Sequence, residues 1–362
     1  DILPSLQERW LLFSNCFSSK IGFWLRTVDP KFTESFSLRY DALLLNHFQK
    51  WLGVSTLGTA AMSQLTLPIA KGGLGFGHTS RIYKAAYLGG TALGLSSLNV
   101  NAGYLETCSW LESFRQIFRS FISLEVFEPM IEMIDLLDDH QIQSSLSDKL
   151  HEKQLLSLQS SLHGENRIRL DSIIASGSFW LRGRPGVVHY LMDNKMMLFS
   201  WKWRLGMPQF SSQTMGKRCH KCSNPLDVFG HHIQRCVPYQ KYRSVRHTDF
   251  KDMWCYVFKM AGLRCRKEPQ GLYPPPPPGK RKRTPDHLVH FFDLTTGKSL
   301  LTDVSVVWPS SEKVLATREK KKKDYYEPDL PRDATFVPLV CDVYGRWGSI
   351  VSTILNLSLI HI

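Results

Sequence analysis

The residues best placed to do chemistry lie between Cys219 and Cys236, in the run C-H-K-C-S-N-P-L-D-V-F-G-H-H-I-Q-R-C. Cys219 and Cys222 have the two-residue spacing that lets both thiolates face one ion across a tight turn. Cys236 and a histidine, either His231 or His232, would complete a tetrahedral Cys3His set. Zinc suits these soft ligands, and four protein ligands leave no open position. The run therefore predicts a structural zinc site that stabilises a segment with little core of its own.

Carboxylates in and beside two predicted strands form the second group of candidates. Residues 300–307 are rich in β-branched residues and contain Asp303, while residues 285–292 form the other strand candidate, with Asp286 near its start. Glu268, upstream of both, is the candidate third carboxylate. A buried carboxylate is costly unless it is paired or binds a metal. Asp286 and Asp303 are thus predicted to bind Mg²⁺, which lowers the pKa of a bound water and neutralises phosphate charge during phosphodiester cleavage.

Such cleavage also needs a positively charged side chain. The charged run at residues 318–326 contains candidate lysines. A lysine there would orient the attacking water or stabilise the transition state. The same residues have purely structural interpretations: Asp286 could cap a strand, Asp303 could form a core salt bridge, and the charged run could be a solvated helix face. Composition alone leaves both interpretations open.

Composition narrows the class of protein. The chain has 362 residues, with 45 Lys and Arg against 32 Asp and Glu, and its 43% hydrophobic content is enough for a folded core. The net charge of +13 indicates a polyanionic partner, most simply nucleic acid, with a merely solubilising basic surface as the alternative. Eight cysteines are too few for a disulfide scaffold, which favours a reducing compartment. No apolar stretch of about 18 residues occurs, so we expect no membrane span.

Two basic segments are candidates for contact with nucleic acid. Basic and aromatic residues are interleaved in residues 178–205, where Arg182 and Arg184 are the candidate phosphate contacts, although an amphipathic helix would use the same pattern. Five prolines at residues 274–278 predict an extended spacer. The basic run after the spacer predicts phosphate contacts or a nuclear import signal, and it consists of Lys280, Arg281, Lys282 and Arg283.

Most of the chain before the cysteine run is predicted to be helical. Apolar residues follow helical spacing in residues 1–100 and again in residues 102–165, and Gly53 is a helix stop. Residues 72–77 contain four glycines, which exclude a helix and predict a tight turn between helices.

In this order, the motifs resemble the C-terminal half of non-LTR retrotransposon proteins that carry a restriction-like endonuclease. Residues 5–100, with Lys-Trp-Leu-Gly at 50–53 and Leu-Pro at 67–68, are similar to the reverse-transcriptase thumb and the region just after it. The sequence Trp-Arg-Leu-Gly at 203–206 precedes the zinc knuckle, as it does in the family.

The resemblance also bears on individual site residues. The sequence at 230–236 is similar to the family's Gly-Asp-His-x-x-x-Cys form, which favours His232 as the zinc ligand, whereas another spacing in the family would suit His231. The family next has a motif of a basic residue, His and Asn. Arg246 and His247 match its first two positions, and a threonine replaces the Asn.

The carboxylates match the layout of PD-(D/E)xK nucleases. Asp286 follows a proline and Asp303 lies in a strand, but Ser305 stands where the usual lysine would be. Family members instead supply a lysine from the following helix, four residues before a tyrosine. Two pairs have this spacing, Lys321 with Tyr325 and Lys322 with Tyr326. The second pair is preferred.

The resemblance implies a mixed architecture: an α-helical N-terminal region, a Cys3His zinc knuckle, and an α/β PD-(D/E)xK-like nuclease core that begins with a helix over about residues 240–263. The predicted segments are a thumb-like region at 1–100, a helical basic linker region at 101–205, the knuckle at 206–240, the endonuclease domain at 241–350 and a tail at 351–362. The tail matches no family element and is interpreted as the product of truncation or faulty assembly.

The implied activity is Mg²⁺-dependent nicking of chromosomal target DNA in the nucleus, whose 3′-hydroxyl would prime reverse transcription of the element's RNA. Target DNA and element RNA are the expected partners. The polymerase palm is absent from this chain, which begins with Asp1, so we expect a fragment that cannot polymerise alone. The alternative is a non-catalytic, zinc-containing nucleic-acid-binding module from a decayed element.

Overall fold

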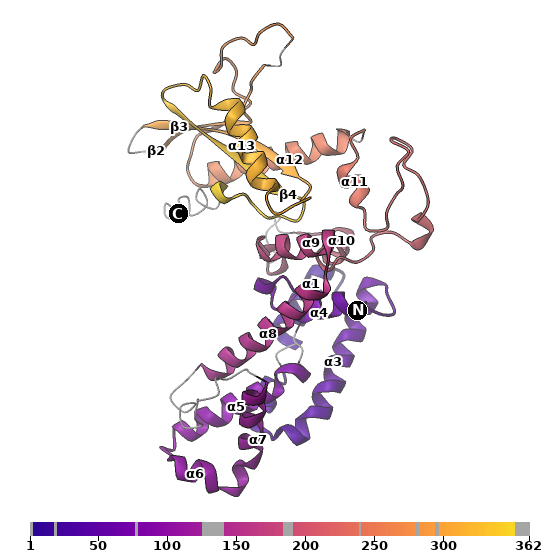
Figure 1. The fold of residues 1–362 in the computed structure, drawn as a ribbon, viewed down its shortest axis with the longest axis vertical. Coiled ribbons are helices and arrows are strands. Elements are labelled where there is room, and N and C mark those ends of the chain that lie inside the picture. The colour runs from indigo at the N-terminus through magenta and orange to yellow at the C-terminus, as the bar shows by residue number, and fades with distance from the viewer. Residues whose placement is uncertain are drawn as a thin grey trace. The chain divides into compact units, whose positions relative to one another are not determined.

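The chain forms two compact units in a computed structural model (Figure 1). Unit 1 comprises Asp1–Leu162 and Ser178–Met207, and unit 2 comprises His163–Gly177 and Pro208–Ile362. Together they are mostly helical, with one small mixed sheet, so the coarse prediction of a mixed α/β architecture is confirmed. The structure describes residues 3–17, 20–76, 79–124, 141–183, 191–238, 240–279, 282–293 and 297–351.

The secondary-structure elements described in unit 1 are all helices, as its apolar periodicity predicts. Among these residues, none of the helices is long and apolar enough to cross a bilayer. Its helices are α1 (Leu6–Leu12), α2 (Gly22–Thr27), α3 (Pro30–Leu52), α4 (Thr59–Thr66), α5 (Thr79–Ser96), α6 (Ala102–Thr107), α7 (Glu112–Ser123), α8 (Ile142–Ser161) and α10 (Asn194–Leu205).

Local signals set the limits of α3, the longest described helix. Asp29 accepts a hydrogen bond from the Lys31 amide at the N-terminus, and Pro30 occupies the first turn, where its missing N–H costs nothing. Gly53 ends the helix in the left-handed conformation, at φ 67°, as the sequence predicts.

An aromatic cluster joins the two parts of the chain that make up unit 1. Trp201 of α10 is fully buried, and its ring centroid lies 5.5 Å from that of Trp10 and 5.3 Å from that of Phe48. The basic and aromatic pattern of this segment therefore serves the core at Trp201 rather than a surface for base stacking.

The glycine-rich stretch is the predicted tight turn, and α10 holds it in place. A Cβ on Gly73 would lie 1.9 Å from the carbonyl oxygen of Leu67, so only glycine fits there. The buried Arg204 side chain donates to the carbonyl oxygens of Gly73 and Ile69 at 2.9 and 3.0 Å, and Gln64 donates to Gly72 at 2.9 Å. These bonds satisfy carbonyl groups that a turn leaves without partners.

Unit 2 combines short helices with the sheet. Its elements are α9 (Gly164–Ile174), α11 (His231–Arg235), α12 (Gln240–Met260), β1 (Cys265–Lys267), β2 (His287–Asp293), β3 (Lys298–Val307), α13 (Val314–Tyr326) and β4 (Ala334–Asp342). The two strands predicted around Asp286 and Asp303 and the helix predicted from about residue 240 are thus present.

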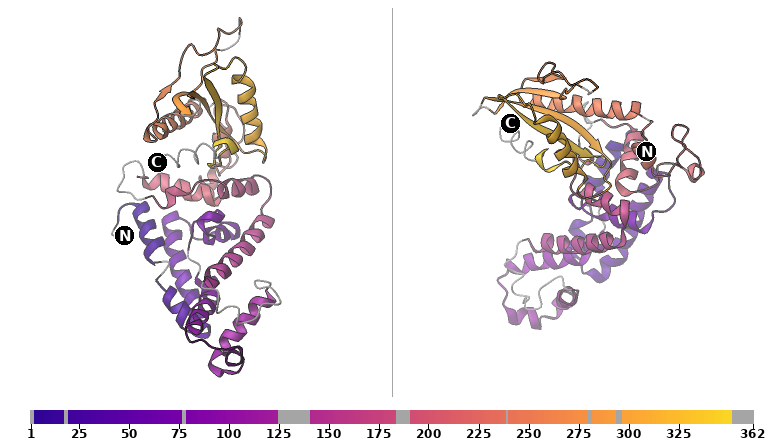
Figure 2. Two further views of the ribbon diagram at one scale, coloured as in Figure 1. Left: turned by 90° about the vertical axis from the view of Figure 1, so that its left-hand side faces the viewer. Right: turned by 45° about the horizontal axis from the view of Figure 1, so that its top comes forward.

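The sheet has the strand order β1-β2-β3-β4 and lies between two helices (Figure 2). The first three strands pair antiparallel, while β3 and β4 are parallel and are connected through α13, the crossover that parallel neighbours require. Trp254 of α12 packs with Leu300 on one face of β3, and Tyr326 of α13 packs with Leu301 on the other. Because side chains alternate along a strand, the odd-numbered residues of β3 face α13.

Candidate metal centre and carboxylate site

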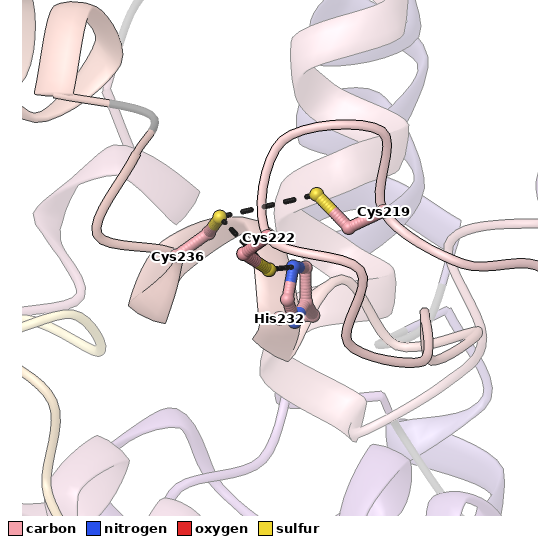
Figure 3. A group of neighbouring side chains, drawn as sticks. All are labelled: Cys219, Cys222, His232 and Cys236. Carbon is pink, nitrogen blue, oxygen red and sulfur yellow. Dashed lines mark hydrogen bonds between the residues drawn. The ribbon is translucent and has the colours of Figure 1, made fainter.

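Four side chains from the segment that connects α10 to α12 in the sequence converge on one point (Figure 3). The Sγ atoms of Cys219 and Cys236 are 3.9 Å apart, those of Cys222 and Cys236 are 3.6 Å apart, and Cys222 Sγ lies 3.4 Å from His232 Nε2. All four donor atoms lie within 4.8 Å of one another. The predicted Cys3His cluster is therefore assembled.

These distances fit a tetrahedral zinc ion. Two sulfurs bound at about 2.3 Å to a tetrahedral ion are about 3.8 Å apart, whereas a disulfide would need about 2.05 Å. Burial alone would raise the pKa of the Cys219 thiol, but hydrogen bonds from the amides of Lys221 and Cys222 and from the side chains of His232 and Cys222 lower it to about 6. A thiol with a lowered pKa readily gives the thiolate that binds metal.

His232, and not His231, is the histidine of the cluster. Asp227 accepts hydrogen bonds from the amides of both residues, at 2.6 and 3.0 Å, and so fixes the start of α11. Adjacent side chains on a helix point in different directions, and His231 Nδ1 lies 3.3 Å from Glu165 while its ring centroid lies 5.0 Å from that of Trp308. The choice between the two histidines is thereby settled.

Helix α11 also connects the cluster to the rest of unit 2. Arg235 donates to Glu165 of α9 at 2.8 Å, and its guanidinium lies 4.6 Å from the ring centroid of Trp308, which follows β3. Gln234 accepts a hydrogen bond from Arg246 of α12. A metal that fixes α11 would therefore also fix contacts to the helix and the strand that carry the carboxylate site.

Asp286 is buried beside β3, and its carboxylate is held from two sides. Its backbone N–H donates to the Thr302 carbonyl at 2.8 Å, and its Oδ2 accepts from the Val304 amide at 2.7 Å. Asp286 is thus bonded to the residues on both sides of Asp303. His247 Nε2 of α12 lies 3.2 Å from the same Oδ2. Burial alone would raise the pKa of Asp286, but the hydrogen bonds from His247 and the Val304 amide lower it.

Asp303 lies in β3, and its side chain contacts α13. Its carboxylate contacts Lys322 Nζ and lies 3.4 Å from the Tyr326 hydroxyl, which also donates to the Thr284 carbonyl at 3.1 Å. Burial raises the pKa of Asp303; the Lys322 charge opposes this shift and the Asp286 charge adds to it. Of the two candidate lysines, Lys322 makes this contact, while Lys321 is exposed.

Glu268 lies just after β1, in the left-handed conformation at φ 47°. Its amide donates to the Asp286 carbonyl at 2.9 Å, which places its backbone beside the carboxylate site. Its own carboxylate contacts Lys251 of α12. Within the described residues, the cysteine cluster is the one group of three or more acidic, His or Cys side chains with metal-ligand spacing, so the aspartate pair and Glu268 do not form such a group.

A polar cavity of about 400 Å³ adjoins the two aspartates. Basic and hydroxyl side chains from α12, β3 and α13 dominate its walls, and none of its described lining residues is acidic. Its lining includes Arg243, Arg246, His247, Ser305, Arg318 and Lys322.

The predicted nucleic-acid contacts have different environments. Arg182 is exposed in unit 1, and Lys282 donates to Gln270 at 2.8 Å. Arg283 binds Asp329 at 2.6 Å and lies 5.0 Å from the Tyr273 ring centroid, so it ties the segment before β2 to the end of α13. The other predicted contacts, namely Arg184, Lys280 and Arg281, lie outside the described residues.

Two basic residues of the site were not identified from the sequence. Lys251 lies one helical turn after His247, a spacing that could have revealed it once α12 was assigned. Arg318 lies one turn before Lys322, but nothing in the sequence distinguishes it within the charged run.

Comparison with models of protein families finds no match for this chain, and comparison with curated proteins finds no significant match either. The functional interpretation therefore depends on the geometry of the two sites.

Proposed function

We propose that unit 2 is a zinc-stabilised, metal-dependent DNA endonuclease of the PD-(D/E)xK type, and that the chain is part of a retrotransposon protein that nicks target DNA to prime reverse transcription of its RNA. The observation that carries the proposal is the convergence of four side chains from separate segments: His247, Asp286, Asp303 and Lys322. They lie beside a basic cavity, the setting that a phosphodiester requires.

The order of the elements supports the proposal. The first helix, the two strands associated with the aspartates and the helix that carries the lysine follow one another as the family resemblance implies, as α12, β2, β3 and α13. The preferred pair, Lys322 and Tyr326, is the pair whose side chains reach Asp303. Arg246 and His247, the matches to the family's basic motif, both line the cavity.

In the proposed mechanism, each side chain has a separate task. Asp286 and Asp303 would hold Mg²⁺ through carboxylate oxygens, the ligands that this ion prefers, and the ion would supply a water of lowered pKa and neutralise phosphate charge. His247 and the Val304 amide hold Asp286 in place. Lys322 balances the buried charge of Asp303 and is positioned to stabilise negative charge on the phosphate.

The test is nicking of supercoiled plasmid by the full chain with Mg²⁺. Asp303→Asn should reduce the nicking rate at least about 100-fold, because it removes the charge of a proposed metal ligand. Asp324→Asn is the matched control, since it makes the same change at an exposed position of α13. Nicking that survives equally in both variants would refute the assignment, provided that both retain zinc and the same unfolding midpoint.

The second candidate function is a nucleic-acid-binding module without catalysis, such as a decayed element would encode. It is favoured by one observation: among the described residues, the aspartates belong to no group of three or more potential metal ligands, whereas the cysteine cluster is such a group. This function predicts salt-sensitive DNA binding with no nicking by the unaltered chain under any divalent metal.

A further inference from the structure

Two cations of α13 are in register with two residues on one face of β3. Lys322 contacts Asp303, and one turn earlier Arg318 Nε donates a 2.8 Å hydrogen bond to Ser305 Oγ. Four residues of helix rise about 6 Å, and two residues of strand span about 6.6 Å, so the two contacts fit the same pair of elements. Arg318 is therefore placed by the same packing that places the proposed catalytic lysine.

The two cations differ in what they contact. Lys322 contacts a carboxylate, whereas the hydrogen bond of Arg318 is to a neutral hydroxyl. Arg246, on the other wall of the cavity, likewise binds a neutral group, the Gln234 amide oxygen. With no acidic residue among the described lining, the cavity holds positive charge that its own walls do not balance. Such a cavity favours an anionic ligand.

We propose that Arg318, oriented by Ser305, binds the phosphate of the DNA strand that enters the carboxylate site, an inference that rests on the proposed endonuclease function. The hydrogen bond to Ser305 engages Nε, and the two terminal Nη groups of the guanidinium form a planar fork, which matches two oxygens of one phosphate. Ser305 stands two residues after Asp303, where the sequence lacks the usual lysine, and its short side chain lets an arginine from α13 supply the positive charge. Arg318 contacts the substrate, and Ser305 is a positioning residue.

The first measurement is the affinity of the full chain for a labelled DNA duplex without Mg²⁺, over a series of salt concentrations. Arg318→Ala should lower the affinity about tenfold and reduce the slope of log K against log salt by about 1, as expected for one lost phosphate contact. Lys298→Ala is the matched control, because it removes one exposed positive charge at the opposite end of β3. It should leave the slope unchanged.

The second measurement separates charge from orientation. Arg318→Lys keeps the charge but loses the fork, and Ser305→Ala keeps the arginine but loses its partner. Both should leave the salt slope unchanged and slow single-turnover nicking, by about 10- to 100-fold for Arg318→Lys, because a charge-assisted hydrogen bond is lost. Zinc content and the unfolding midpoint identify any variant that does not fold.

The outcomes distinguish this inference from the proposed function. If the unaltered chain nicks DNA and Asp303→Asn does not, but Arg318→Ala binds DNA with the same affinity and salt slope as Lys298→Ala, the phosphate contact is refuted and the endonuclease stands. If the unaltered chain does not nick DNA, the endonuclease is refuted, and the salt slope still decides whether Arg318 binds phosphate.

Discussion

At the scale of single residues, the contact between His247 and Asp286 makes the carboxylate site sensitive to pH. The hydrogen bond to Asp286 raises the pKa of His247, while burial opposes this shift. Because the folded pKa exceeds the unfolded one, the stability that His247 contributes is complete below about pH 6.5 and is lost as pH rises through the folded pKa. The lowered pKa of Asp286 has the opposite effect: its contribution is present above about pH 3.9 and is lost as pH falls through the folded pKa. The pair is therefore strongest between these limits.

His247→Gln should remove the upper part of this pH dependence. Between about pH 6 and pH 8.5, the unaltered chain should lose more stability than the variant. The difference should stay below about 1 kcal/mol, because the His247 side chain is 40% exposed and solvent screens the pair. Urea unfolding of both proteins at the two pH values measures it. Equal losses in the two proteins would show that the pair contributes nothing to stability.

Residue types alone do not decide which of two histidines joins the thiols or which of two lysines meets Asp303. The contacts in the structure decide both. His231 and His232 are neighbours, but they project to different sides of α11, so only the latter meets the thiols. Lys321 and Lys322 likewise both lie four residues before a tyrosine. Adjacent residues of α13 point in different directions, and it is Lys322 whose side chain contacts Asp303.

At the scale of elements, the glycine-rich turn shows how a tertiary contact sets a local conformation. The turn connects α4 to the chain before α5, and Arg204, which is far away in the sequence, donates hydrogen bonds to it. The sequence predicts the turn because its glycines exclude a helix. It does not predict that Arg204, a basic residue of the segment predicted to contact nucleic acid, becomes the buried hydrogen-bond donor.

Gly73→Ala should therefore destabilise unit 1 by on the order of 3 kcal/mol, because the new Cβ would clash with the carbonyl groups of Leu67 and Gln64 in a turn that hydrogen bonds from Arg204 and Gln64 hold in place. Gly94→Ala is the control, since a Cβ there would meet nothing within 4 Å and alanine favours the helix. Thermal unfolding of both variants measures the effect. Similar midpoints for the two would show that the turn can shift at little cost.

At the scale of the whole molecule, each unit has its own hydrophobic core. The clusters centred on Trp201 and on Phe114 lie in unit 1, and those that cover the two faces of β3 lie in unit 2. The cysteine cluster belongs to unit 2 alone. A ligand that binds only the folded state stabilises the unit that contains its site.

We expect two unfolding transitions in calorimetry, of which only one responds to zinc. Chelation should lower the transition of unit 2 and leave the other in place, because the metal's binding free energy stabilises only the fold that contains the site. His232→Gln should abolish this response, and His231→Gln should retain it. A zinc response of both transitions, or one that survives His232→Gln, would contradict the prediction.

Local patterns in the sequence predict many of the helices and strands and most of the candidate ligands. Cysteine spacing, runs of β-branched residues and helical periodicity are local patterns, and local patterns report the conformation of the segment that contains them. The cysteine run and the strands at β2 and β3 could be predicted for this reason, whereas the helix α12 was expected from the family resemblance.

Only the tertiary structure decided which side chains meet. The contacts of Asp286 with Val304 and His247, of Asp303 with Lys322, and of Ser305 with Arg318 join segments that are 13 to 39 residues apart. Such contacts depend on strand register and on the rotation of each helix against the sheet. A one-residue change in either would turn these side chains to another face, and no local pattern specifies it.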